Sequence, residues 1–204
     1  TDSQLSFVLS NRSFSRVIWG NDNTCKFFKS LPTPLKCTDL YFHNRSSAAI
    51  VNIDFLHSLS SPQINDVARK FSLDIFTFNQ QACSSPKTFF VYSPISLDGA
   101  LPLLSRFFDL ISKHALSISS LSDSSAVDKF KKLSDLSCQV EGIDLVLDSN
   151  LLAAFSVDQS SPIISSQLQN GILHFRPISN ISQLSLFLDS SFQTLVHYGF
   201  SSDE

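Results

Sequence analysis

The stretch from residue 73 to residue 117 constrains the fold most, because three hydrophobic patterns follow one another there. Residues 73–78 carry apolar side chains at every second position, which is typical of a half-buried strand. Residues 88–92 are β-branched or aromatic throughout, and Pro94 ends this run because proline has no N–H to give to a ladder. After Gly99, apolar residues recur at helical spacing: Leu101, Leu104, Phe107, Phe108, Ile111 and Ala115. The sequence predicts a β-loop-β-α unit at the centre of the molecule.

The segment before residue 35 is expected to form a small β-rich subdomain. Its three short extended candidates are residues 6–9, 14–19 and 25–28, and the Gly-Asn-Asp-Asn sequence at 20–23 has the composition of a turn. The Leu-Pro-Thr-Pro sequence at 31–34 breaks regular structure. We therefore expect a subdomain over residues 1–34 and an α/β body over 35–204, which could divide further into 35–120 and 121–204.

Strands and helices alternate through the rest of the chain. A strand is expected at 38–43 with a hairpin partner at 48–53, and a helix begins at Ser61, where proline follows in the first turn. Downstream, the patterns predict helices at 122–136, 148–155 and 181–198, a helix start at 160–162, and strands at 143–147 and 172–176. This interleaving indicates an α/β or mixed α+β fold.

Composition excludes several classes of protein. Apolar residues make up 43% of the 204 and charged residues 16%, so the chain can bury a core. A net charge of −3 gives the chain no excess of positive charge of the kind that nucleic-acid-binding proteins carry. No apolar run reaches the roughly 20 residues needed to span a bilayer. A first residue other than methionine is expected of a fragment or a processed product.

Few residues suggest chemistry. The four cysteines, Cys25, Cys37, Cys83 and Cys138, are far apart and are expected to be free thiols in a reducing compartment. Cys83 lies in the loop before residue 88 and could act as a nucleophile, although an idle thiol is the simpler interpretation. Cys37 and His43 could supply two metal ligands, whereas a site needs three or four.

Other motifs of catalysis and cofactor binding do not occur. The chain contains no phosphate loop, no glycine-rich dinucleotide fingerprint and no nucleophile elbow. The remaining histidines are expected to be structural: His57, His114, His174 and His197. The aspartates considered include no pair that could be defended as an acid and a base: Asp98, Asp109, Asp144, Asp148 and Asp158. The residues thus predict no catalytic, cofactor-binding or metal-binding site.

The central unit resembles a known viral domain. The strings Leu-Asp-Ile-Phe-Thr-Phe at 73–78, Cys-Ser-Ser at 83–85, Lys-Thr-Phe-Phe-Val-Tyr-Ser at 87–93 and Pro-Ile-Ser-Leu-Asp-Gly-Ala-Leu at 94–101 follow one another. Weaker matches are Asp-Leu-Tyr-Phe at 39–42, Phe-Lys-Lys-Leu at 130–133 and Asp-Ser-Asn-Leu-Leu-Ala-Ala-Phe at 148–155. Together they resemble the C-terminal Y domain of coronavirus non-structural protein 3, although the zinc-binding clusters of that region are missing.

The resemblance implies a non-enzymatic domain without cofactors. It would lie on the cytosolic face of endoplasmic-reticulum-derived replication membranes in the host cytoplasm. Its partners would be membrane-embedded replicase subunits or further copies of itself, with the membrane reached only through the parent protein and no nucleic acid bound. Assembly of double-membrane vesicles would be its role. Two alternatives stay open: a scaffold or adaptor domain of a cellular complex, and an enzyme that uses Cys83.

Overall fold

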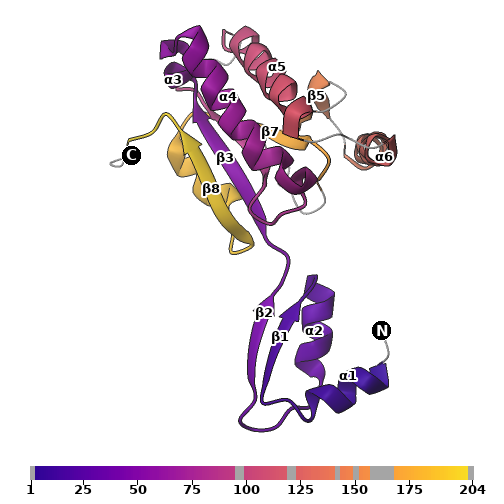
Figure 1. Ribbon diagram of the computed structural model, residues 1–204. Coiled ribbons are helices and arrows are strands. Elements are labelled where there is room, and N and C mark those ends of the chain that lie inside the picture. The colour runs from indigo at the N-terminus through magenta and orange to yellow at the C-terminus, as the bar shows by residue number, and fades with distance from the viewer. Residues whose placement is uncertain are drawn as a thin grey trace. The chain divides into compact units, whose positions relative to one another are not determined.

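The computed structural model describes residues 3–94, 99–118, 123–140, 143–148, 152–156 and 168–201. Spatial contacts divide the chain into two compact units, Thr1–Arg45 (unit 1) and Ser46–Glu204 (unit 2). Strands and helices interleave in both, which confirms the predicted α/β class (Figure 1). The predicted subdomain over residues 1–34, with its boundary at residue 34, stays a prediction. Within the described ranges, every helix is too short or too polar to cross a bilayer.

Unit 1 is a parallel β-α-β unit preceded by a helix. Strands β1 (Ser15–Trp19) and β2 (Thr38–Phe42) pair in parallel and are connected through α2 (Asp22–Ser30), and α1 (Ser3–Ser10) precedes them. The predicted strands at 6–9 and 25–28 are therefore wrong, because these segments lie in α1 and α2. The misread signal is the turn at 20–23: Asn21 Oδ1 accepts a hydrogen bond from Thr24 N at 2.8 Å and so caps a helix.

The two faces of the β1–β2 sheet differ sharply. Arg16 and Ile18 are buried on one face. The other face, called the open face below, presents four exposed apolar side chains: Val17, Trp19, Leu40 and Phe42. The Trp19 ring stacks on the Phe42 ring with centroids 5.1 Å apart. An uncovered apolar face is unusual for a parallel sheet, since such sheets are normally covered on both sides.

Unit 2 is built on a six-stranded sheet in the order β5-β6-β7-β4-β3-β8. The strands are β3 (Ser46–Asn52), β4 (Pro86–Tyr92), β5 (Asp144–Asp148), β6 (Ala153–Ser156), β7 (Ile172–Ile178) and β8 (Phe192–Tyr198). Neighbouring strands are parallel except β5 and β6, which pair antiparallel. The central strands β3, β4 and β7 are almost wholly buried, as expected for a parallel sheet covered on both faces.

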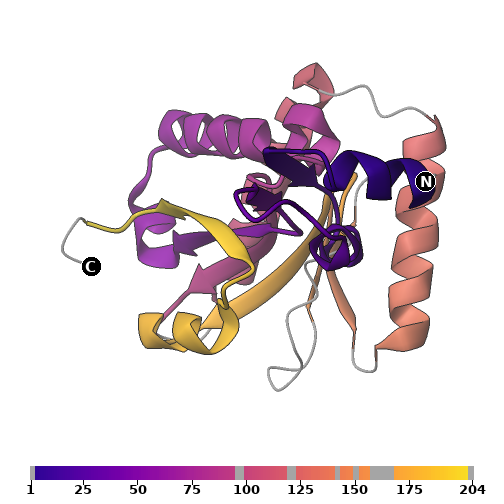
Figure 2. The ribbon, with the colours of Figure 1, turned by 90° about the horizontal axis from the view of Figure 1, so that it is seen from below.

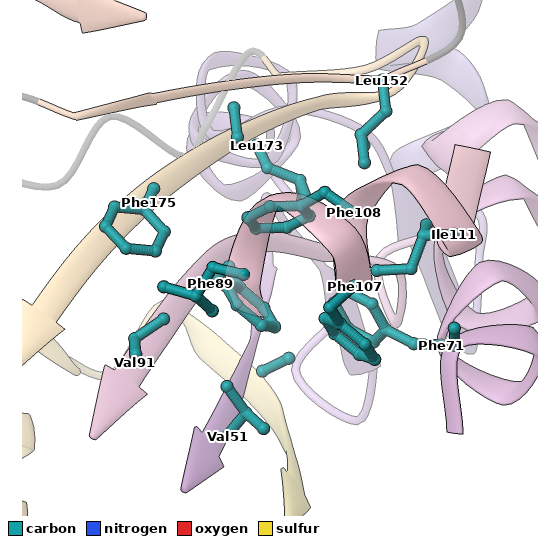
Figure 3. Packing of buried hydrophobic residues seen from close by; sticks show 14 of the residues in the cluster. Val51, Phe71, Phe89, Val91, Phe107, Phe108, Ile111, Leu152, Leu173 and Phe175 are labelled. Carbon is teal, nitrogen blue, oxygen red and sulfur yellow. The ribbon is translucent and has the colours of Figure 1, made fainter. Parts of the chain in front are cut away.

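Helices cover both faces of this sheet. On one face, α3 (Ile53–Ser58), α4 (Ser61–Phe76) and α5 (Leu101–Ile118) supply the helical side of the main hydrophobic core, and α4 lies beside α5 (Figure 1). The rings of Phe71, Phe89 and Phe107 meet at its centre (Figure 3). On the other face lie η2 (Ile181–Gln183) and α7 (Leu184–Phe187) (Figure 2). A third cluster joins α6 (Asp123–Gln139) to Phe155 of β6.

Several predicted elements of unit 2 are confirmed. The confirmed strands are those at 88–92, 143–147 and 172–176. The confirmed helices are those that begin at Ser61, after Gly99 and at 122–125. In unit 1, the predicted strands at 14–19 and 38–43 are confirmed as well. The segment at 48–53 is a strand, but the predicted hairpin is wrong, because β3 pairs with β4 and β8 whereas β2 pairs with β1. The predicted helix start at 160–162 lies outside the described residues.

Three further predictions fail, two of them where a short apolar run fits both periods. Residues 73–78 form the end of α4 and the start of η1 (Thr77–Gln80), because the helical stripe through Phe71 continues to Ile75. The helix predicted at 148–155 is wrong, since β6 occupies its end and is buried between β5 and β7. The helix predicted at 181–198 breaks after α7: Asp189 Oδ1 accepts from Ser191 N at 2.8 Å, and the chain then enters β8.

His174 of β7 makes the stability of unit 2 sensitive to acid. Its side chain is fully buried, and its ring stacks on the Phe155 ring with centroids 5.3 Å apart. Burial lowers the pKa of His174 from 6.5 to about 3, and the charge of Arg176 acts in the same direction. As pH falls below 6.5, the unfolded chain therefore binds a proton that the folded chain excludes. We expect His174 to cost unit 2 about 2 kcal/mol of stability between pH 7 and pH 5.

Urea unfolding at pH 7 and pH 5 measures this cost. The His174→Gln variant should lose about 2 kcal/mol less than the wild type over this interval, whatever its stability at pH 7. His57→Gln is the matched control, because His57 is exposed, and it should keep the wild-type pH dependence. An identical loss in His174→Gln and the wild type would contradict a buried neutral imidazole.

Candidate active site around Cys83

Helix α4 ends in a turn with an unusual backbone. Phe78, Asn79 and Gln80 have φ angles of 59°, 52° and 62°, which place three successive non-glycine residues in the left-handed region. This conformation costs roughly 1–2 kcal/mol per residue because Cβ approaches the following carbonyl oxygen. Such strain persists only where surrounding contacts determine the conformation, and it occurs often at functional sites.

The Gln80 side chain supplies contacts of this kind. Gln80 is fully buried. Its Nε2 donates to the carbonyl oxygens of Pro86 at 2.8 Å and Ile172 at 3.0 Å, and its Oε1 accepts from Gly171 N at 3.0 Å. A further backbone bond joins Asn170 N to Asn79 O at 3.2 Å. The turn is thereby fixed to the first residues of both β4 and β7.

Cys83 lies in the same loop, just before β4. Its carbonyl oxygen accepts a hydrogen bond from the buried Ser47 hydroxyl of β3 at 2.7 Å, and Ser85 N donates to Ala82 O at 3.1 Å. Cys83 and Cys138 are exposed, whereas Cys25 is buried and Cys37 is partly buried. The backbone on both sides of Cys83 is thus held at the amino ends of β3, β4 and β7, with the residue itself open to solvent.

A cation accompanies the Cys83 thiol. Lys87, the second residue of β4, is partly buried. Burial lowers the pKa of Lys87 below its ordinary value, and negative charge on Cys83 acts in the opposite direction. The two groups therefore interact electrostatically. Neighbouring cations of this kind are typical of reactive cysteines.

Unit 1 contains a separate cavity of about 390 Å³. It lies between α1, β1 and Phe28 of α2, and its lining includes the apolar side chain of Leu9 and the hydroxyls of Ser6, Ser10 and Ser13. Its size is within the 300–1,000 Å³ range of small-molecule pockets.

Arg16, one of the residues that line this cavity, is paired with Asp39. Arg16 Nε and Nη2 donate to the two carboxylate oxygens of Asp39 at 2.7 and 2.5 Å, and Tyr41 Oη donates to Asp39 Oδ2 at 2.6 Å. Arg16 Nη1 reaches Ser10 Oγ at 3.1 Å and Phe28 O at 3.0 Å. The Arg16 hydrogen bond, followed by that from Tyr41, holds the pKa of Asp39 well below its usual range. The Arg16 charge is thus neutralised inside unit 1.

The other candidate residues of the sequence analysis, the pair Cys37 and His43 and the remaining histidines and aspartates, do not come together as a metal-binding or catalytic site among the described residues. Cys37 Sγ lies 3.7 Å from Asp39 Oδ1, whereas His43 Nδ1 lies 3.8 Å from Asp22 Oδ1, so the two do not share a ligand set. Throughout the described ranges, no group of three His, Cys, Asp or Glu residues could hold a metal. His114 contacts Asn65 and His197 contacts Phe200, while Asp98 and Asp158 lie outside the described residues.

Comparisons with known proteins find one matching family model. Residues 1–99, which include the Cys83 loop, match the family model of LuxC, an acyl-CoA reductase. No curated protein matches the chain.

Solved structures of aldehyde dehydrogenases share the fold. Aldehyde dehydrogenase C of Pseudomonas syringae, with NAD+ and octanal, has a TM-score of 0.56 and 13% identity over 87% of this chain and 39% of its own. Indole-3-acetaldehyde dehydrogenase of P. syringae, with NAD+ and IAA, has a TM-score of 0.62 and 8% identity over 98% and 43%. NADP-dependent glyceraldehyde-3-phosphate dehydrogenase of Bacillus halodurans, with NADP, has a TM-score of 0.59 and 13% identity over 97% and 47%. The chain therefore has part of the aldehyde dehydrogenase fold and spans less than half the length of these proteins.

These findings overturn the viral interpretation. The resemblance to the coronavirus Y domain is wrong, because the matched model describes a reductase and the shared fold is that of dehydrogenases. The expectations of a non-enzymatic domain, of a role in vesicle assembly and of a location on host replication membranes are wrong with it, and the scaffold alternative has no support. The expected lack of nucleic-acid binding stays a prediction.

Proposed function

We propose that the chain is part of an acyl-CoA reductase with the aldehyde dehydrogenase fold, and that Cys83 is its nucleophile. The observation that carries this proposal is the strained turn at residues 78–80, which is fixed by the Gln80 side chain and followed by the exposed thiol of Cys83. The matched family model covers this turn. Both P. syringae structures are of variants in which a cysteine is replaced by alanine, and both hold NAD+ with a second ligand.

Acyl transfer to Cys83 requires no group beyond the thiol and the thioester. The Cys83 thiol loses its proton to solvent, and the thiolate attacks the carbonyl carbon of acyl-CoA. A new carbon–sulfur bond forms, the bond to the CoA sulfur breaks, and CoA leaves as a thiolate that takes up a proton. The acyl group remains on Cys83 as a thioester.

A nicotinamide cofactor would supply the hydride that converts the acyl thioester to an aldehyde. The cavity of unit 1 fits the nucleoside end of such a cofactor in size, with Leu9 and Phe28 as apolar walls and Ser6 and Ser10 as hydrogen-bonding groups. The Arg16 charge is already neutralised by Asp39, which leaves the hydroxyls to bind the uncharged ring and sugar. A glycine-rich fingerprint, which binds the pyrophosphate of a dinucleotide, does not occur in the sequence of the chain. We therefore assign to this cavity the nucleoside end of the cofactor alone.

Incubation of the chain with octanoyl-CoA, without any cofactor, tests the nucleophile. We expect intact-mass spectrometry to show one added octanoyl group, which hydroxylamine removes and which peptide mapping places on Cys83. Cys83→Ala should remain unmodified. Cys138→Ala is the matched control, because Cys138 is the other exposed cysteine, and it should react like the wild type.

Two outcomes would overturn the proposal. One is a wild-type chain that keeps its fold and gains no octanoyl group. The other is acylation of Cys138 at the same rate as Cys83, since this would show only the ordinary reactivity of an exposed thiol.

A further inference from the structure

The Gln80 side chain joins three segments of unit 2, one of which is far from the other two in the sequence. Its hydrogen bonds to Pro86, Gly171 and Ile172 connect the end of η1 with the first residues of β4 and β7. Gly171 is 91 residues away in the chain. Gln80 is fully buried, and its amide uses both N–H donors and its carbonyl oxygen.

The chemistry of these bonds requires an amide at this position. Two of the partners are carbonyl oxygens and one is a backbone N–H. A glutamate of the same shape would place an ionised carboxylate against two carbonyl oxygens, to which it cannot donate. A glycine would keep the left-handed backbone without strain and would remove all three bonds.

We propose that Gln80 is a positioning residue for the Cys83 thiol. Cys83 is three residues further along the same loop, and its own carbonyl is held from the other side by Ser47. With the amide in place, the loop is fixed before Cys83 by Gln80 and at Cys83 itself by Ser47, so the thiol keeps one position. Without it, the strained turn loses the bonds that hold it, and the thiol samples other positions. The inference rests on the proposed role of Cys83.

The test compares two cysteines within one molecule. Iodoacetamide labelling followed by peptide mass spectrometry gives the rate at Cys83 relative to Cys138, which is exposed and lies in α6. We expect this ratio to fall about fivefold or more in Gln80→Glu and Gln80→Gly, a loss typical of a displaced reacting group. Gln81→Glu is the matched control, because Gln81 is the next residue and is exposed, and its ratio should stay within about twofold of the wild type.

Acylation kinetics separate positioning from a general loss of structure. With octanoyl-CoA as the probe, the maximal rate of Cys83 acylation should fall about tenfold in Gln80→Glu, while the half-saturating concentration stays within about twofold, because Gln80 is buried and does not reach the substrate. Circular dichroism should show that the variants keep their helical content.

Each failure has its own signature. A wild-type chain that octanoyl-CoA never acylates overturns the proposed function, whereas the labelling ratio still tests Gln80. Acylation of the wild type with unchanged labelling ratios and maximal rates in both Gln80 variants overturns the Gln80 inference alone. Complete unfolding of both variants also overturns it, because Gln80 would then serve the stability of the whole unit.

Discussion

Replacing Phe89 with alanine is expected to lower the free energy of unfolding of unit 2 by about 3–5 kcal/mol. Phe89 of β4 is fully buried, and its ring contacts four others, those of Phe71, Phe107, Phe108 and Phe175, with centroids 5.1 to 6.5 Å apart (Figure 3). The lost side chain removes apolar contacts and leaves a cavity that a close-packed core cannot refill. Loss of this ring would loosen the contact between α4, α5 and the central strand.

Urea unfolding followed by circular dichroism measures the change. Phe130→Ala is the matched control, because Phe130 lies on α6 with 72% of its surface exposed, and it should alter stability by no more than about 0.5 kcal/mol. Equal effects of the two substitutions would mean that the aromatic cluster is not the core of unit 2.

Replacing Asp39 with asparagine is expected to destabilise unit 1 by about 2 kcal/mol. The change removes the charge that pairs with Arg16, whose side chain is 8% exposed, and leaves a buried guanidinium without a counter-ion. We take a value below the 3–5 kcal/mol typical of fully buried pairs, because Asp39 is 23% exposed and water partly replaces the lost partner. In a unit of only 45 residues, this is a large share of the total stability.

Hydrogen exchange read by mass spectrometry locates the loss. Amides of β1 and β2 should exchange about 30-fold faster in Asp39→Asn, while those of β3 and β4 keep their wild-type rates. Asp66→Asn is a control, because Asp66 forms an exposed ion pair with Lys70, and it should leave the exchange rates of β1 and β2 unchanged.

The contribution of Asp39 to the stability of unit 1 depends on pH as well. The lowered pKa of Asp39 stabilises folded unit 1 above about pH 4, and this contribution disappears as the pH falls further.

Local patterns predicted the long elements of the fold but not all of the short ones. Helix α5 is 18 residues long, and its buried positions repeat with one clear period, whereas β4 is recognised by its continuous run of aromatic and β-branched residues. Residues 73–78 are too few to separate a period of two from one of 3.6, and packing against α5 decided in favour of the helix. The viral resemblance failed for a related reason, since short apolar strings recur wherever α/β folds bury strands and helices.

The candidate site could be reached from the sequence only in part. Cys83 was visible as a loop cysteine, yet nothing near it in the sequence distinguishes it from an idle thiol. Its distinguishing features depend on distant partners, namely Ser47, 36 residues away, and Gly171, 91 residues from Gln80. Left-handed backbone at Phe78 and Gln80 has no composition signal either, because glycine, the usual residue there, is absent.

The open face of unit 1 provides a natural optical reporter. Trp19 is the single tryptophan of the chain, is 77% exposed, and lies against Phe42 on this face. Indole emission responds to the polarity of its surroundings, so water on the open face and protein or ligand on it correspond to different emission maxima. Tryptophan emission therefore reports directly, without a label, whether this face is covered. Unit 2 contributes no tryptophan signal, because Trp19 is the single tryptophan of the chain.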